Sequence, residues 1–297
     1  MNNSHRVLET LLFAVFASAS AQATERPSPP TLLTADATCT NNVVLTGYWP
    51  ATNEMLRPWS TNPAQNPDQW VGRNWHGMGY DVYAFFPEFP PDGNPMNDAF
   101  GSDGWAGAEG SDLQVDYQDT SRDFWRIVDE LHPRVLITTS RGDAIGWEIE
   151  RVEGGHGGQG DPSADWSSDR HGEEGLPTRS TVQPRTWAAI STWRGGQRLT
   201  SSLPLERIAQ AAAALELTSV AIDDDTSGNY LSGFIALHGL YYHETTATNL
   251  AAGHIHVGTH VAPPVARQLM EASLAAVLEA FPPAHVACPG RALTPAR

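Results

Sequence analysis

The chain has 297 residues, with 34 acidic and 18 basic side chains and a formal net charge of −16. This acidity argues against nucleic acid or an anionic membrane as a partner, because binding to phosphate groups depends on a basic surface. The length is sufficient for one large domain with a substantial core, which we expect at residues 42–297.

The first 23 residues have the pattern of an export signal. Arg6 precedes a short apolar core at 11–17, and the small residues of ASASAQA follow it. This core is shorter than the roughly 20 apolar residues that cross a bilayer. We therefore expect cleavage after residue 23, a tail at 24–41, and a secreted or periplasmic protein with no membrane association. The alternative is a disordered or buried N-terminus, since Glu9 is unusual beside such a core.

Short apolar runs alternate with amphipathic ones along the chain. Strands are predicted at 43–49, 80–86, 134–139, 217–222 and 254–257. Helices are predicted at 121–132, 205–217 and 265–281. Thr120 or Ser121 can cap the first helix and Pro133 can stop it, while Pro204 suits the first turn of the second. The alternation predicts a three-layer α/β/α fold with a mostly parallel sheet.

Two stretches interrupt this pattern, near 90–118 and 153–179. Both are rich in glycine, aspartate and proline, and the second also contains histidines. Long loops of this kind are functional covers or insertions, and Trp105 and Trp166 within them can close over a ligand.

The two cysteines, Cys39 and Cys288, lie near opposite ends of the chain. In an oxidising compartment they can pair, and we predict a disulfide between them; the alternative is two unrelated thiols. Neither cysteine has neighbours typical of a nucleophile, so a thiol enzyme is not expected.

Three residues that follow or lie in predicted strands form a candidate catalytic set. Ser232 precedes an apolar helical run, His256 lies in GHIHVG, and Glu150 lies in WEIERV. Ligands of parallel α/β sheets bind at the carboxyl ends of the strands, so these side chains can converge there. A hydroxyl, an imidazole and a carboxylate are the minimum parts for acyl transfer.

Each of these residues also has a plainer interpretation. Ser232 can be an N-cap, His256 a buried core residue, and Glu150 a solvent-facing strand residue. His254, His256 and His260 form an HxHxxxH pattern that, with a carboxylate from 223–225, can hold zinc. Because the spacing alone is weak evidence, we predict no metal and a solvated acidic loop.

Several segments together resemble the pyroglutamyl peptidase I (pyrrolidone-carboxylate peptidase) family. VVLTGYWPATNEMLRPW is similar to its first strand and TGF-x-P-F-G-G loop, and SSLPLERIAQA resembles its S-x-LP segment. IERV looks like its VERVAIN segment, which implies Glu150 as catalytic glutamate, and GHIHVG looks like its IHVP segment, which implies His256. DTSGNYLSGFIALHGLYYH is similar to the nucleophile segment. The similarity covers about 43–60 and 134–281 and implies a mixed central sheet.

The departures from the family pattern are specific. Ser232 stands where the family has its nucleophilic cysteine, and Gly233 where asparagine is usual. The second aromatic residue of the first loop falls on Ala51, although Tyr48 retains the first. The NxxDARxPDN stretch, with its arginine, has no counterpart. In an oxidising compartment a serine escapes the oxidation to which a catalytic thiolate is exposed.

The resemblance implies an amide hydrolase that removes an N-terminal pyroglutamyl or related small acyl group from peptides, without a cofactor. Ser232, His256 and Glu150 form the triad, and N–H groups near Gly233 hold the oxyanion. Tyr48, Trp49, Asn229 and Tyr230 contact a small peptide or acyl-amino substrate. The alternatives are a catalytically inactive binding module and, third, a metal-dependent hydrolase. The oligomeric state stays open.

Overall fold

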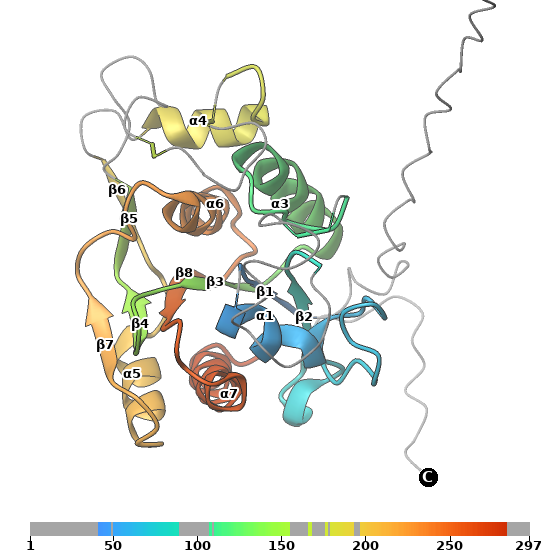
Figure 1. The fold of residues 1–297 in the computed structure, drawn as a ribbon, viewed down its shortest axis with the longest axis vertical. Coiled ribbons are helices and arrows are strands. Elements are labelled where there is room, and N and C mark those ends of the chain that lie inside the picture. Colours follow the sequence, from blue (N-terminus) through green and yellow to red (C-terminus); the bar gives the residue numbers. More distant parts are fainter. Residues whose placement is uncertain are drawn as a thin grey trace, which may run out of the picture.

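The computed structural model describes residues 41–48, 50–88, 107–108, 110–154, 166–167, 176–177, 179–192 and 197–283. They form three layers, in which a six-stranded sheet lies between two groups of helices (Figure 1). This confirms the predicted fold class. The predicted signal segment, Cys39, Cys288, Trp49 and Trp105 lie outside the described residues.

The central sheet is mixed and has the order β2-β1-β3-β8-β4-β7. Its strands are β1 (Asn41–Thr46), β2 (Tyr80–Phe85), β3 (Val135–Arg141), β4 (Trp147–Glu150), β7 (Val220–Asp223) and β8 (Ala251–Val257). Strands β2, β1, β3 and β8 are parallel to one another. Strand β4 runs antiparallel to β8, and β7 runs parallel to β4. Just beyond β4, β5 (Val152–Gly154) pairs with β6 (Arg198–Thr200) in a separate antiparallel ribbon.

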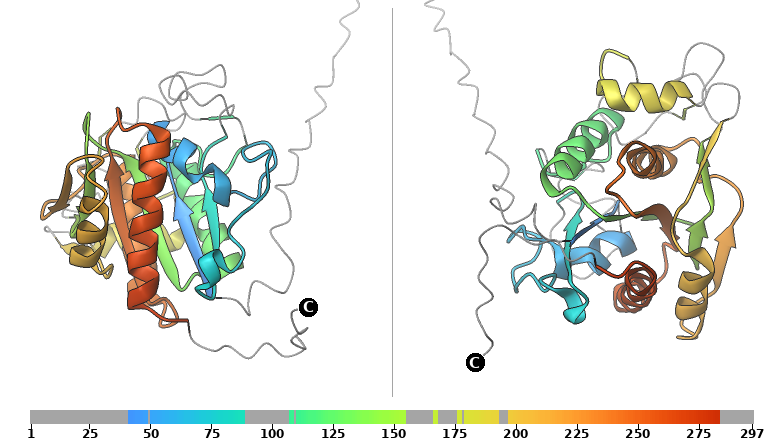
Figure 2. Two further views of the ribbon diagram at one scale, coloured as in Figure 1. Left: turned by 90° about the horizontal axis from the view of Figure 1, so that it is seen from below. Right: turned by 180° about the vertical axis from the view of Figure 1, so that it is seen from behind.

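Helices cover both faces of the sheet (Figures 1 and 2). One face carries α3 (Tyr117–Leu131), α4 (Pro184–Thr192) and α6 (Leu231–Thr245). The other carries α1 (Pro50–Leu56), α5 (Leu205–Ala213) and α7 (Pro263–Ala280). Short 3₁₀ turns lie at Arg57–Trp59 and Trp75–Gly77. Because strand side chains alternate, Leu136 and Ala252 pack in the α6 layer, while Ile137 and Ile255 pack in the α7 layer.

Helix α3 begins earlier than predicted, at Tyr117 rather than near residue 121. Its N-cap is Asp116, whose carboxylate accepts hydrogen bonds from the N–H groups of Gln118 at 2.8 Å and Asp119 at 3.3 Å. Such a cap satisfies N–H groups that the first turn leaves without partners. Leu113 and Tyr117 are fully buried, so the end of the stretch expected as an insertion belongs to the core.

Helix α5 is shorter than predicted, ending at Ala213 rather than residue 217. The N–H groups of Leu215 and Glu216 donate to carbonyls three residues earlier, which tightens the last turn, and Glu216 has a left-handed φ of 56°. Strand β7 consequently starts at Val220 and not at 217. In the described part of the chain, no helix has the length and hydropathy needed to cross a membrane.

Candidate active site

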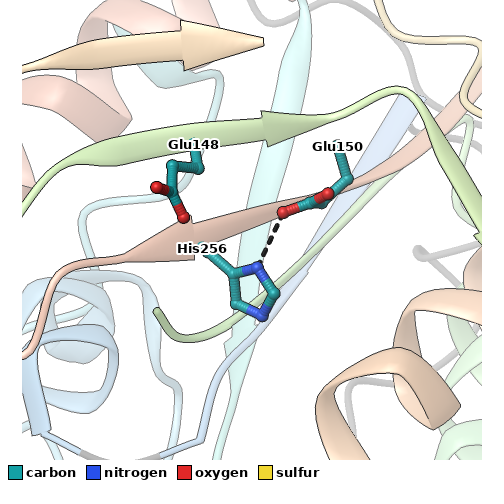
Figure 3. A group of neighbouring side chains, drawn as sticks. All are labelled: Glu148, Glu150 and His256. Carbon is teal, nitrogen blue, oxygen red and sulfur yellow. Dashed lines mark hydrogen bonds and ion pairs between the residues drawn. The ribbon is translucent and has the colours of Figure 1, made fainter. Parts of the chain in front are cut away.

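A buried carboxylate–imidazole pair lies where β4 and β8 meet. Nδ1 of His256 is 2.7 Å from Oε1 of Glu150, and the ionised carboxylate accepts the Nδ1 hydrogen (Figure 3). Glu150 is 1% exposed and His256 is 8% exposed. The pair predicted from sequence is therefore formed, and it leaves Nε2 as the nitrogen with a free lone pair.

The strand arrangement that brings Glu150 and His256 together differs from the one predicted. The prediction relied on parallel strands that all end at one edge of the sheet. In the structure β4 is antiparallel to β8, with Glu150 opposite His254 and Glu148 opposite His256. The Glu150–His256 bond therefore runs diagonally across two neighbouring strands, a separation that long side chains can span.

His254 supports His256 from the side. Its Nδ1 is 2.8 Å from the hydroxyl of Thr138 and its Nε2 is 2.9 Å from the hydroxyl of Ser140. The His254 ring meets the His256 ring edge-on at 4.8 Å between centroids. Burial, and secondly the neighbouring His256, hold the pKa of His254 well below its usual range, so this ring is neutral. With both nitrogens occupied, His254 cannot act as the zinc ligand considered from sequence.

Two glutamates on β4 flank His256 from the same face of the strand. Burial raises the pKa of Glu150, and the hydrogen bond from His256 opposes that rise. Burial also raises the pKa of Glu148, which lies opposite His256 across the strands and is only partly exposed. Nearby Asp223 raises both values further. Two carboxyl groups therefore lie close to His256, and burial opposes the ionisation of both.

Ser232 lies in the first turn of α6, where backbone N–H groups have no hydrogen-bond acceptor among the described residues. The first intrahelical bond is donated by Phe234 to the carbonyl of Tyr230 at 3.1 Å. Within the described residues, the N–H groups of Leu231, Ser232 and Gly233 have no acceptor, and no side chain caps the helix. A helix start of this kind can hold a developing negative charge.

The first turn of α6 lies toward the same end of the sheet as the Glu150–His256 pair. A Cβ at Gly239 would lie 3.6 Å from Thr138, which pairs with His254. Seven residues of helix rise about 10 Å, which carries the chain from Gly239 to Ser232. His243, in the last turn of α6, is hydrogen-bonded to Asn249 just before β8, so the last turn of α6 lies beside the start of β8. The rise from Gly239 to Ser232 therefore leads toward the end of β8 that carries His256. No hydrogen bond joins Ser232 to His256 among the described residues, so that contact stays a prediction.

Glu153 is a buried carboxylate beneath the loop that leads to Ser232, and sequence reasoning missed it. Its carboxylate accepts the N–H of Ser227 at 3.1 Å, the Thr226 hydroxyl at 3.3 Å and the Ser227 hydroxyl. It is 1% exposed, and burial raises its pKa well above the usual range, with the charge of Glu150 adding to the rise. In sequence it appeared as one acidic residue at the start of a Gly- and Asp-rich stretch, which carries no signal of burial.

Gly233 has a packing reason to be glycine. A Cβ at this position would overlap the carbonyl oxygen of Gly228 and lie 3.8 Å from Oε2 of Glu153. The loop around Gly228 therefore packs directly on the first turn of α6. A larger residue at 233 cannot be accommodated without moving this loop.

The predicted aromatic contacts of the first loop and the second insertion lie in the core. Tyr48 is 2% exposed, and its hydroxyl is 2.5 Å from that of Thr120. Trp166 is buried and packs edge-on against Tyr117 and Phe234. In this arrangement neither ring presents a face to a ligand.

Asn229 and Tyr230 lie in the loop before Ser232 and differ in exposure. The side-chain oxygen of Asn229 accepts the Ser167 hydroxyl at 2.9 Å, and its carbonyl accepts the Ser167 N–H at 2.8 Å. Tyr230 is 59% exposed, directly before the open helix start. Of the predicted substrate contacts in the described residues, Tyr230 is exposed, Asn229 is partly exposed and Tyr48 is buried.

Comparisons with solved structures give the same fold. Two variants of the pyrrolidone carboxyl peptidase of the hyperthermophile Pyrococcus furiosus align with 81% of this chain and 99% of their own, at 13% identity and TM-scores of 0.51 and 0.52. A structure described as Pf-PCP(1-204)-C aligns with 80% of this chain and 96% of its own, at 12% identity and a TM-score of 0.52. No protein-family model and no curated protein matches the chain. At such low identity the likeness establishes the fold.

Proposed function

We propose that this protein is a serine-dependent amide hydrolase that removes an N-terminal pyroglutamyl, or a related small acyl or aminoacyl group, from peptides. The observation that carries the proposal is the buried hydrogen bond of 2.7 Å between His256 and Glu150. The proposal is also supported by Ser232 in the first turn of α6, a helix start that no side chain caps. The fold shared with pyrrolidone carboxyl peptidases supports the same chemistry.

In this proposal the hydroxyl of Ser232 attacks the carbonyl carbon of the substrate. Nε2 of His256 accepts the hydroxyl proton, and Glu150 stabilises the imidazolium through Nδ1. The negative charge on the carbonyl oxygen is held by the open N–H groups at 231–233. His256 then passes the proton to the departing amine, and a water molecule hydrolyses the acyl-serine by the same steps in reverse.

A binding module without activity is the second candidate. It is favoured by the absence of a Ser232–His256 hydrogen bond in the described residues and by the buried position of Tyr48. In that case the acidic end of β4 would bind the free amine of a peptide without cleaving it.

The test is the hydrolysis of fluorogenic amides that carry a pyroglutamyl, an acetyl or an alanyl group. We expect turnover by the unaltered protein and a loss of about 10³-fold or more in kcat for Ser232→Ala. Ser219→Ala, which alters an exposed serine beside β7, is the matched control and should retain full turnover. Equal turnover by Ser232→Ala and Ser219→Ala would exclude Ser232 as nucleophile. Binding of a pyroglutamyl peptide without turnover would favour the binding module.

A further inference from the structure

We propose that Glu148, Glu150 and His256 form a zinc site whose occupancy switches the hydrolase off. Each residue offers one ligand atom, and these atoms lie within 4.8 Å of one another. Glu148 and Glu150 share one face of β4. Nδ1 of His256 is directed at Glu150, and the Glu148 carboxylate lies on the Cβ side of the ring (Figure 3). The inhibitory consequence rests on the proposed function, whereas the binding of zinc does not.

The Glu150 carboxylate is only half satisfied by hydrogen bonds to the described residues. Oε1 of Glu150 is bonded to His256, but Oε2 is buried and has no hydrogen-bond partner among the described residues. A buried carboxylate oxygen without a partner is costly, because it has lost its bonds to water. The Glu148 carboxylate is likewise not hydrogen-bonded to any described residue. A divalent cation would satisfy both carboxylates.

Gly142 packs closely against two of the three side chains. A Cβ at Gly142, just after β3, would lie 2.9 Å from Cβ of His256 and 3.5 Å from Oε2 of Glu148. A larger residue at 142 would therefore press on His256 and on Glu148, two of the side chains that would bind the metal.

The donor set favours zinc among the common divalent ions. Imidazole and carboxylate ligands bind zinc at about 2.0–2.2 Å, and three protein ligands with one open position are typical of non-structural zinc sites. In a tetrahedral arrangement the ligand atoms are about 3.4 Å apart. The widest separation in the present group, up to 4.8 Å, therefore has to narrow by about 1.4 Å, and the 2.7 Å between Nδ1 of His256 and Oε1 of Glu150 has to widen by about 0.7 Å. Glu148 is only partly buried and can make this adjustment. Magnesium prefers oxygen ligands alone, and manganese binds such sites more weakly.

Zinc would block the reaction by changing which ring nitrogen of His256 carries the proton. In the hydrogen-bonded pair, the neutral ring carries its proton on Nδ1 and offers Nε2 as the base. Zinc bound at Nδ1 requires the lone pair there, so the single ring proton moves to Nε2. The ring then has no free lone pair to accept the proton of Ser232.

The binding test is calorimetric titration of zinc into protein freed of metal with a chelator. We expect one zinc per chain, and at least about tenfold weaker binding for Glu148→Gln. Glu271→Gln, on α7 across the sheet, is the matched control and should bind zinc as the unaltered protein does. Cobalt in place of zinc should give the visible absorption of a four-coordinate site, and Glu148→Gln should weaken it. Absence of stoichiometric zinc, or equal binding by the two variants, would overturn the site.

The proposed inhibition by zinc is tested separately, by the rate at which a fluorophosphonate modifies Ser232. Zinc should slow this labelling in the unaltered protein and in Glu271→Gln at concentrations that do not slow it in Glu148→Gln. Labelling that is fast in saturating zinc would overturn the inhibition. Absence of labelling without zinc, together with stoichiometric zinc in calorimetry, would remove the proposed hydrolase and the inhibition while leaving the zinc site in place.

Discussion

Replacing Glu153 by glutamine should change how the stability of the protein depends on pH. The folded-state pKa of Glu153 is raised well above the value of about 4.3 that an unfolded chain has. At a pH below about 4.3 the Glu153 carboxyl is protonated in both the folded and the unfolded state, so its ionisation has no effect on stability. As pH rises further the unfolded state ionises first, so the folded state loses up to about 1.4 kcal/mol per pH unit until Glu153 also ionises.

Glutamine at position 153 removes this loss of stability with rising pH and keeps the hydrogen bonds to Thr226 and Ser227. Its oxygen can accept the N–H of Ser227 and the hydroxyl of Thr226, and its NH₂ group can donate to the Ser227 hydroxyl. Glu153→Gln should therefore match the unaltered protein near pH 4 and become progressively more stable than it toward pH 7. Glu153→Ala loses all three hydrogen bonds and should be destabilised by about 2–4 kcal/mol near pH 4. This difference should narrow as pH rises, because alanine also lacks the carboxyl group that ionises.

The measurement is urea unfolding of the three proteins at a series of pH values. Because other carboxyl groups titrate equally in all three, the difference between glutamate and glutamine isolates position 153, together with its coupling to Glu150. A difference that does not vary with pH, or a glutamine variant that loses stability relative to the unaltered protein as pH rises, would refute the reasoning. The first result would mean that Glu153 ionises in the folded state as easily as in the unfolded chain, and the second that it ionises more easily.

Further predictions concern catalysis by the same elements. Glu150→Gln should lower kcat by about 10⁴-fold, because an amide can donate to Nδ1 of His256 and so favour the wrong tautomer; a loss below tenfold would contradict the pairing. Gly233→Ala should lower activity and destabilise the protein by about 1–3 kcal/mol in urea unfolding, because its Cβ collides with the carbonyl of Gly228; unchanged stability would show that the loop moves freely.

Much of the fold was predictable because its signals are local. The apolar runs of β1, β2, β3 and β8 and the periodicity of α3 and α7 are visible in short windows of sequence. The direction of β4 was not predictable from four residues, WEIE, because it depends on pairing with β8. The cap of α3 was missed because Asp116 precedes the apolar pattern that marked the helix.

The candidate site was also predictable from the sequence only in part. The pairing of Glu150 with His256 followed from a resemblance of several segments, and the structure contains it. Glu153 and Glu148 were not predicted, because nothing in their sequence neighbourhood distinguishes them from solvated carboxylates. Their importance arises from tertiary contacts: the loop at Thr226 encloses one, and the register of β4 sets the other opposite His256.

The central claim is that a serine at the start of α6 is activated by the imidazole at the end of β8. Its most direct test is treatment of the metal-free protein with a fluorophosphonate, followed by mass-spectrometric mapping of the modified peptide. The account predicts one modification, at Ser232, which is lost in His256→Ala. Modification of a different serine, or labelling of Ser232 that is unchanged in His256→Ala, would contradict it.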